Sequence, residues 1–207
     1  MTPSRRFFSF EGVDGSGKST QARLLAQSLR EAGLPVTLTR EPGGSTGAEE
    51  IRSLVLEGDP DRWSAETELL LFTAARRDHV EKTILPALEA GHIVITDRFA
   101  DSTRLYQGLR GELTDTVDIL HRTMIGIDPD LTFLIDIPAE IGLARAQARA
   151  DTEQRFEDMG LDLQRRMRDG FLELAKAPRF RIIDGARDQG TIAADILATA
   201  MAYLDAC

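Results

Sequence analysis

Five short runs of largely apolar residues recur along the chain, and within each run the apolar residues stand on consecutive positions more than on alternate ones. The runs span residues 7–10, 36–39, 93–96, 131–135 and 180–183. Such runs are typical of strands buried on both faces, and helix-like segments separate them. Strands that alternate with helices are joined by right-handed crossovers in a parallel sheet. The pattern therefore predicts an α/β fold, namely a three-layer α/β/α sandwich with a five-stranded parallel sheet.

The longest helix-like segment spans residues 64–90 and contains Pro86. Because a proline inside a helix removes a backbone hydrogen bond, we expect a kink or a new helix start there. Gly91 follows the segment and marks its end. The chain contains no internal repeat, low-complexity tract or linker, so we expect a single domain over residues 1–207.

Composition agrees with one folded domain and excludes several classes of function. The 207 residues are 42% apolar and 29% charged, as in ordinary globular proteins. The net charge of −9 argues against binding to a nucleic acid polymer, which depends on a basic surface. The apolar run near the start is too short for a signal peptide or a membrane span, so no membrane association is expected. The single cysteine, Cys207, fits a reducing cytoplasm.

A glycine-rich stretch follows the first apolar run and precedes a helix-like segment. It reads Gly12, Val13, Asp14, Gly15, Ser16, Gly17, Lys18, Ser19 and Thr20. In this context the glycines allow successive backbone N–H groups to face phosphate oxygens, while Lys18 adds a positive charge and Ser19 offers a hydroxyl to Mg²⁺. The stretch is a P-loop, so the sequence predicts a P-loop NTPase type of fold that binds a nucleoside triphosphate such as ATP.

The third apolar run ends in Asp97 and Arg98, which should therefore lie at the same edge of the sheet as the P-loop. Asp97 resembles an acid that orients Mg²⁺ or its water, and Arg98 has the fork geometry that grips a phosphate. The alternative is a local ion pair at the end of the strand.

Residues 40–46, Arg-Glu-Pro-Gly-Gly-Ser-Thr, form a loop too rich in turn residues for regular structure. Its simplest interpretation is a tight connection in which Ser45 or Thr46 caps the next helix. Arg52 on that helix is a candidate partner for a substrate phosphate, and the alternative is a solvated surface arginine.

Further along, an aromatic ring and several hydrogen-bonding side chains have helical spacing. Phe72 and Arg76 stand four residues apart and share a helix face, which suits stacking on a base and donating to its edge; the alternative is that Phe72 belongs to the core. Thr103 and Gln107 have the same spacing and suit a base edge, and Tyr106 suits a sugar. The alternative for this segment is an ordinary polar helix start.

An arginine-bearing segment at about residues 145–157 is interpreted as a mobile lid. Arg145, Arg149 and Arg155 within it suit the charge on a transferring phosphoryl group. As a bare run of charges, the segment also fits a solvated helix face.

Taken together, these motifs resemble those of bacterial thymidylate kinases, a branch of the P-loop nucleoside monophosphate kinases. The matching stretches are residues 10–21, 39–44, 72–76, 97–99 and 106–108, followed by the arginine-rich lid. The resemblance implies transfer of the ATP γ-phosphate to dTMP, giving dTDP and ADP for dTTP synthesis, with Mg²⁺ and a homodimer. Rival interpretations are a kinase for another nucleotide or deoxynucleoside, and a P-loop switch ATPase. A guanine-reading Asn-Lys-x-Asp segment is absent from the sequence.

The resemblance also implies which residues bind the substrates. Lys18 and the loop amides would hold the ATP phosphates, and Arg98 would hold the phosphate of dTMP. Asp14 would face the 3′-hydroxyl of dTMP or the metal and water beside it. Phe72 would stack on thymine, and Arg76, Thr103 and Gln107 would read its edge, with Tyr106 beside the sugar.

Catalytic positive charge is implied to come from the lid. Because position 16 is Ser, the P-loop carries no arginine of its own, and Arg149 and Arg155 are the candidates, with Arg145 behind them. The lid departs from the family pattern, since Gln154 stands where many relatives have Asp.

Overall fold

The computed structural model describes residues 6–59, 62–148 and 160–206. In this part of the chain the strands are β1 (Phe7–Glu11), β2 (Val36–Arg40), β3 (Ile93–Asp97), β4 (Leu131–Asp136) and β5 (Phe180–Asp184). The helices are α1 (Lys18–Glu31), α2 (Thr46–Leu56), α3 (Ala65–His79), α4 (Leu85–Glu89), α5 (Ala100–Arg110), α6 (Thr114–Leu120), α7 (Ala139–Gln147), α8 (Gly160–Leu174) and α9 (Gln189–Asp205). Two π-helical turns, η1 (Val80–Ile84) and η2 (His121–Ile125), continue α3 and α6. Each predicted strand is confirmed to within one residue at its end.

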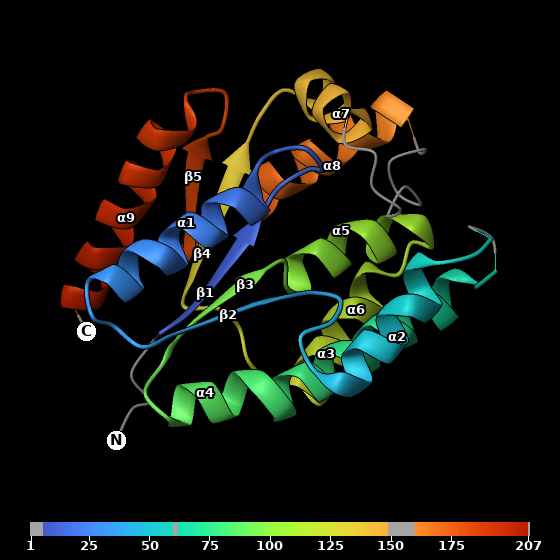
Figure 1. The fold of residues 1–207 in the computed structure, drawn as a ribbon. Coiled ribbons are helices and arrows are strands. Elements are labelled where there is room, and N and C mark those ends of the chain that lie inside the picture. The colour runs from blue at the N-terminus through green and yellow to red at the C-terminus, as the bar shows by residue number, and fades with distance from the viewer. Residues whose placement is uncertain (1–5, 60–61, 149–159, 207) are drawn as a thin grey trace.

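The five strands form one parallel sheet, as predicted, and the structure gives their order as β2-β3-β1-β4-β5 (Figure 1). The register pairs Phe10 of β1 with Asp97 of β3, and Asp97 with Arg40 of β2. The loops that follow these three strands therefore begin at the same edge of the sheet. This edge is where ligands bind in open parallel sheets.

Alternate residues of the strands pack on the two faces of the sheet. Phe8, Phe10 and Phe133 pack on one face with side chains of α1 and α9. Phe7 and Val94 pack on the other face with η1 and the start of α5, and Leu134 packs there with α8. The structure thus has the predicted three layers, and burial of aromatic and aliphatic side chains on both faces explains why the strand sequences are apolar on consecutive positions.

The long helix-like segment is interrupted as predicted. α3 begins at Ala65, where Ser64 accepts a hydrogen bond from the backbone N–H of Thr67. It changes to π-helical geometry in η1, and Pro86 lies in the first turn of α4 directly after this change. The residues before Pro86 remain helical, so its missing N–H removes one bond of the helical ladder. Gly91 follows with a φ of 82°, in the left-handed region that commonly ends a helix.

Candidate active site

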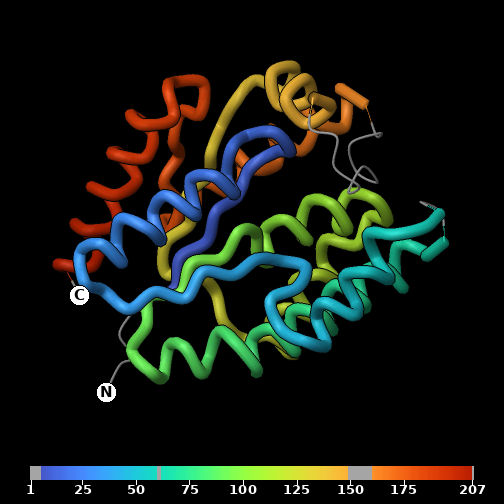
Figure 2. Tube along the Cα trace, in the orientation of Figure 1, coloured from blue at the N-terminus to red at the C-terminus, as the bar shows by residue number. Residues whose placement is uncertain are grey.

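The P-loop joins the end of β1 to the start of α1, and its backbone passes very close to α7 (Figure 2). A Cβ on Gly15 would lie 2.0 Å from the carbonyl oxygen of Gly142 in α7, and the φ of Gly15 is +79°. Only glycine meets both conditions without displacing the helix. The side chains of Val13 and Ser16 are buried, so the loop presents mainly backbone to a ligand.

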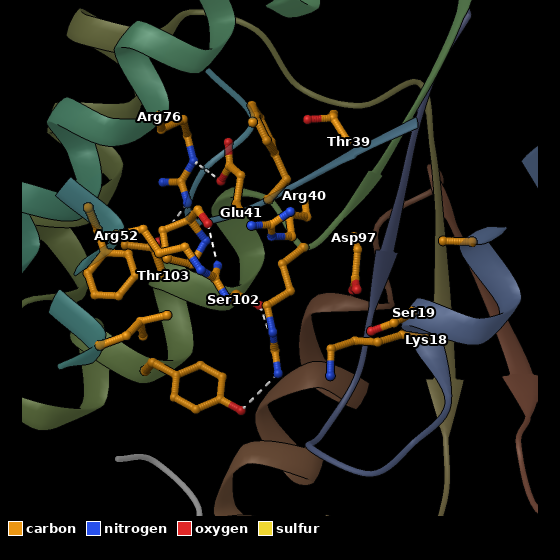
Figure 3. Close-up of a pocket in the computed structure, with 18 of the residues that line it drawn as sticks. Lys18, Ser19, Thr39, Arg40, Glu41, Arg52, Arg76, Asp97, Ser102 and Thr103 are labelled. Carbon is orange, nitrogen blue, oxygen red and sulfur yellow. Dashed lines mark hydrogen bonds and ion pairs between the residues drawn. The ribbon is translucent and has the colours of Figure 1, made fainter. Parts of the chain in front are cut away.

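One large cleft runs from the P-loop to the helices on the opposite side, with a volume of about 700 Å³ (Figure 3). It unites the predicted residues from distant parts of the sequence. Its lining includes Asp14, Lys18, Ser19, Arg52, Phe72, Arg76, Asp97, Arg98, Thr103, Tyr106 and Gln107. The side chains of Lys18, Ser19 and Asp97 lie on one side, and those of Arg52, Arg76 and Thr103 lie on the other (Figure 3).

Asp14 stands at the centre of a buried cluster of polar groups. Arg98 Nη2 donates to its Oδ1 atom, and the Tyr106 hydroxyl donates to its Oδ2 atom at 2.8 Å. Lys18 Nζ lies 3.4 Å from Oδ1. Burial alone raises the pKa of Asp14, but Arg98 and Lys18 outweigh it and hold the pKa well below its usual range. The cluster therefore carries a carboxylate between two cations.

The same cluster fixes the protonation of its other members. Burial and the Arg98 cation lower the pKa of Lys18, against the carboxylates around it. Burial and the neighbouring Asp14 carboxylate raise the pKa of Tyr106, so its hydroxyl remains a hydrogen-bond donor. Arg98 itself stays charged, because the surrounding oxygens raise its pKa more than burial lowers it.

The backbone and a buried relay both orient Arg98. Its φ of 71° lies in the left-handed region, which is uncommon for a residue with a side chain and typical of functional positions. Arg98 Nη1 donates to the hydroxyl of Ser102 at 2.8 Å, and this hydroxyl donates to Glu11 Oε2 at 2.7 Å. Glu11 also accepts from the backbone N–H of Phe99 at 2.8 Å. Arg98 forms its ion pair with Asp14 of the P-loop, which corrects the alternative of a local pair with Asp97.

Glu11 is fully buried at the end of β1. Burial and the nearby Asp101 carboxylate raise its pKa to about 7, although Arg98 and the hydrogen bonds from Ser102 and Phe99 act in the opposite direction. The group therefore changes charge close to neutral pH.

Asp97 and Ser19 fit the predicted magnesium site. The Oδ1 atom of Asp97 is buried and finds no hydrogen-bond partner within the described part of the chain, and Ser19 lines the same cleft. Among the described residues no three His, Cys, Asp or Glu side chains gather as a preformed cage. An oxygen pair of this kind suits Mg²⁺, which usually takes one or two protein ligands and completes its shell with water and substrate phosphate.

The opposite side of the cleft is built by α3 and α5. Phe72 is only 8% exposed, so it packs into the protein and also lines the cleft. Arg76 Nε donates to Glu41 at 2.7 Å, and its Nη2 donates to the Thr103 hydroxyl at 2.8 Å. Gln107 Nε2 donates to Glu68 at 3.0 Å. The predicted helical spacing thus brings all four side chains into one wall.

The loop at residues 40–46 has a larger part in the site than the sequence indicated. Glu41 is buried between Arg76 and His79, and His79 Nδ1 lies 3.1 Å from its carboxylate. Burial raises the pKa of Glu41, but the two basic neighbours lower it further, so the net shift is downward. Ser45 precedes α2 at the N-cap position, but its hydroxyl donates to Asp78 instead of capping the helix.

Three site residues were missed because each acts through a partner from a distant segment. They are Glu11, Glu41 and Glu68. For Glu11 and Glu68 the available signal was a carboxylate next to an apolar run, since acidic residues are seldom fully buried without a partner. Glu41 lies in a turn-rich loop and carried no such signal.

The remaining candidates vary in their placement. Arg52 is half-buried, donates to the carbonyl oxygen of Pro42 and lines the cleft. Arg145 is exposed near the end of α7. Arg149 and Arg155 lie outside the described residues.

Comparisons with known proteins agree with one another. The family model described as thymidylate kinase matches residues 10–196. The thymidylate kinase of Ruegeria pomeroyi is 65% identical to this chain, over 99% of this chain and 99% of its own length. The thymidylate kinase of Dinoroseobacter shibae is 62% identical, over 96% of this chain and 97% of its own length. The crystal structure of thymidylate kinase from Ehrlichia chaffeensis superposes with a TM-score of 0.77 at 36% identity, covering 96% of this chain and 99% of that chain.

The raised pKa of Glu11 makes stability depend on pH. Its ordinary value is 4.5 and the folded value is about 7, so the folded protein binds the proton more tightly than the unfolded chain does. This contribution to stability is present below pH about 4.5 and is lost as the pH rises through about 7. We expect the free energy of unfolding of the protein, relative to that of Glu11→Gln, to fall by about 1–3 kcal/mol over this window.

Urea unfolding of the protein and of Glu11→Gln at several pH values from 5 to about 8 measures the difference. Glu66→Gln, at an exposed position on α3, is the control for the change in net charge. A difference between the protein and Glu11→Gln that is constant or rises with pH would contradict the assignment.

Proposed function

Because the chain belongs to the thymidylate kinase family, we propose that it transfers the γ-phosphate of ATP to dTMP, giving dTDP and ADP for dTTP synthesis. One observation carries the proposal: a single cleft joins the P-loop lysine to a wall made by an aromatic ring and base-edge hydrogen-bonding groups. Such a cleft accommodates a triphosphate at one end and a nucleoside monophosphate at the other. Its volume of about 700 Å³ is in the range of small-ligand sites.

The donor nucleotide binds at the P-loop. The backbone amides of residues 12–17 and the α1 N-terminus face the phosphates of ATP, and Lys18 places its ammonium beside them. Mg²⁺, held by Ser19 and Asp97, would neutralise charge on the donor phosphates. The unpartnered Oδ1 atom of Asp97 supports this assignment.

The acceptor nucleotide binds between Arg98 and α3. Arg98 holds the phosphate of dTMP, and Arg52 lines the part of the cleft that receives dTMP. Asp14 takes the 3′-hydroxyl, and Tyr106, fixed by its bond to Asp14, fills the space beside the sugar. Phe72 stacks on thymine while the edge of the base meets α3 and α5.

The side chains that would recognise the base are held in place by hydrogen bonds within the protein. Arg76 keeps Nε on Glu41 and Nη2 on Thr103, and in the described part of the chain no hydrogen bond engages its Nη1 atom. That atom is therefore available to donate to the O4 atom of thymine. Thr103 and Gln107 complete the edge-reading group.

Phosphoryl transfer is direct and roughly in line, without a covalent enzyme intermediate. The attacking group is an anionic phosphate oxygen of dTMP, so the reaction needs positioning and charge neutralisation more than a strong base. Lys18 and Arg98, which both contact Asp14 Oδ1, supply positive charge beside the reacting phosphates. We assign the additional charge to Arg149 and Arg155 of the lid, because Ser16 leaves the P-loop without an arginine.

We also propose that the protein works in the cytoplasm as a homodimer. Exposed apolar side chains support the dimer: Leu54, Leu70, Ile119 and Met124 lie on α2, α3, α6 and η2, a connected set of helices. The single cysteine in the sequence supports a reducing compartment. None of the described helices is long and apolar enough to cross a membrane.

A panel of acceptors tests the proposed reaction. With ATP and Mg²⁺, we expect diphosphate formation to be fastest with dTMP and much slower with dCMP, AMP or GMP. Chelation of Mg²⁺ with EDTA should abolish it. A coupled assay for ADP, with the nucleotide products separated by chromatography, makes the measurement. Preference for another acceptor would favour a different nucleotide kinase, and ATP hydrolysis indifferent to dTMP would favour a switch ATPase.

Removing the P-loop ammonium tests the donor site. We expect Lys18→Ala to lower kcat by about 10²–10³-fold, because the charge on the transferring group loses a stabilising partner. Circular dichroism and the thermal midpoint should show a retained fold. A folded variant with near-normal turnover would remove Lys18 from the mechanism.

The oligomeric state follows from light scattering during size-exclusion chromatography. We expect a mass of twice the 22.8 kDa of one chain. Substituting the most exposed of the four apolar side chains, as in Leu70→Glu, should shift the mass toward that of the monomer, since a buried unpaired charge weakens an apolar interface. A monomeric parent protein would refute the dimer.

A further inference from the structure

The edge-reading residue Gln107 is held from behind by a carboxylate that does not line the cleft. Glu68 of α3 is 0% exposed, and its Oε1 atom accepts a hydrogen bond from Gln107 Nε2 at 3.0 Å. The other carboxylate oxygen, Oε2, accepts from Arg110 Nη1 at 2.7 Å. Glu68 therefore links two side chains of α5 to α3, and only Gln107 of the three lines the cleft.

The chemistry of a carboxylate decides which end of the Gln107 amide faces it. In its ion pair with Arg110, Glu68 only accepts hydrogen bonds, so the group turned toward it must be the NH₂ end of the amide. The opposite orientation would place the amide carbonyl oxygen against a buried carboxylate oxygen, which is costly. The amide oxygen is then the acceptor that Gln107 offers to a ligand in the cleft.

We propose that Glu68 sets the preference of this site for thymine over cytosine by fixing Gln107 as an acceptor. The inference rests on the proposed function. Thymine presents an N3–H donor beside the O4 acceptor, which match the Gln107 oxygen and the Arg76 N–H groups. Cytosine presents an N3 acceptor and an N4 amino donor. It would set acceptor against acceptor and donor against donor, and a site built for one hydrogen-bond pattern rejects the reverse strongly.

Glu68 is thus a positioning residue that acts through Gln107. A purely structural role, in which the Glu68–Arg110 pair only joins α3 to α5, predicts loss of stability without any change in base preference. The two roles are separated by the ratio of kcat/KM for dTMP to kcat/KM for dCMP. The ratio for dTMP to dUMP is the matched substrate control, because thymine and uracil share the same hydrogen-bonding edge.

The test is a double-mutant cycle with Glu68→Gln, Gln107→Ala and the double variant, assayed with ATP and Mg²⁺. Glu68→Gln keeps the shape of the side chain but can present either a donor or an acceptor, so Gln107 is free to turn. We expect the dTMP to dCMP ratio to fall by about tenfold or more, and the dTMP to dUMP ratio to stay within about twofold. In the Gln107→Ala background, Glu68→Gln should change neither ratio. Glu66→Gln, exposed on the same helix, should leave both as in the parent protein.

An unchanged dTMP to dCMP ratio in folded Glu68→Gln overturns the inference, as does an equal change in the presence and absence of Gln107. If the parent protein prefers dTMP, these results leave the proposed function standing. A parent protein that does not phosphorylate dTMP overturns both.

A second measurement needs no variant at position 68. The side-chain NH₂ protons of Gln107, identified by their loss in Gln107→Ala, should exchange with D₂O at least about tenfold more slowly than those of Gln27. Gln27 is the internal control, since it donates to Glu31 at 2.8 Å but lies exposed on α1. Equal exchange rates for the two amides would overturn the proposal.

Discussion

The ion pair between Arg98 and Asp14 connects the carboxyl ends of two neighbouring strands, and the rest of the site is arranged around it. It depends on the parallel register of β1 and β3, which brings the P-loop and the end of β3 to one edge of the sheet. Desolvation of two charges is costly, and the pair is tolerated because Tyr106, Ser102 and Lys18 supply further hydrogen bonds and charge. The result is a cleft with its positive charges already in place.

Three buried carboxylates, one lining the cleft and two behind it, play the same part, because each aligns one group that faces a ligand. Glu11 orients Arg98 through the hydroxyl of Ser102, and Glu41 holds Arg76 from the side. Glu68 holds the amide of Gln107. An arginine or amide with part of its donors engaged loses little freedom on binding, so its remaining donors or acceptors are preorganised. This arrangement also explains how a chain with a net charge of −9 concentrates cations at one site.

The fold and much of the site could be predicted from local sequence patterns. The apolar runs gave the strands to within one residue, and the P-loop motif gave the residues that lie at the end of β1. The spacing of Phe72 with Arg76, and of Thr103 with Gln107, correctly predicted shared helix faces. The sequence treated a core position and a site position as alternatives for Phe72. The structure shows that the ring is buried and also lines the cleft. The family resemblance was confirmed by the comparisons with known proteins.

The sequence by itself determined the features that depend on residues close together in the chain. These are strand burial, the change of helix geometry before Pro86, the glycine conformations of the P-loop and the identity of the family. Only the tertiary structure decided the pairing of charges. The partners of Arg98, Arg76 and Gln107 come from segments that lie 84, 35 and 39 positions away in the chain. No local periodicity records such pairs, because burial removes competing water and lets strand order and helix packing choose the partner of each buried charge.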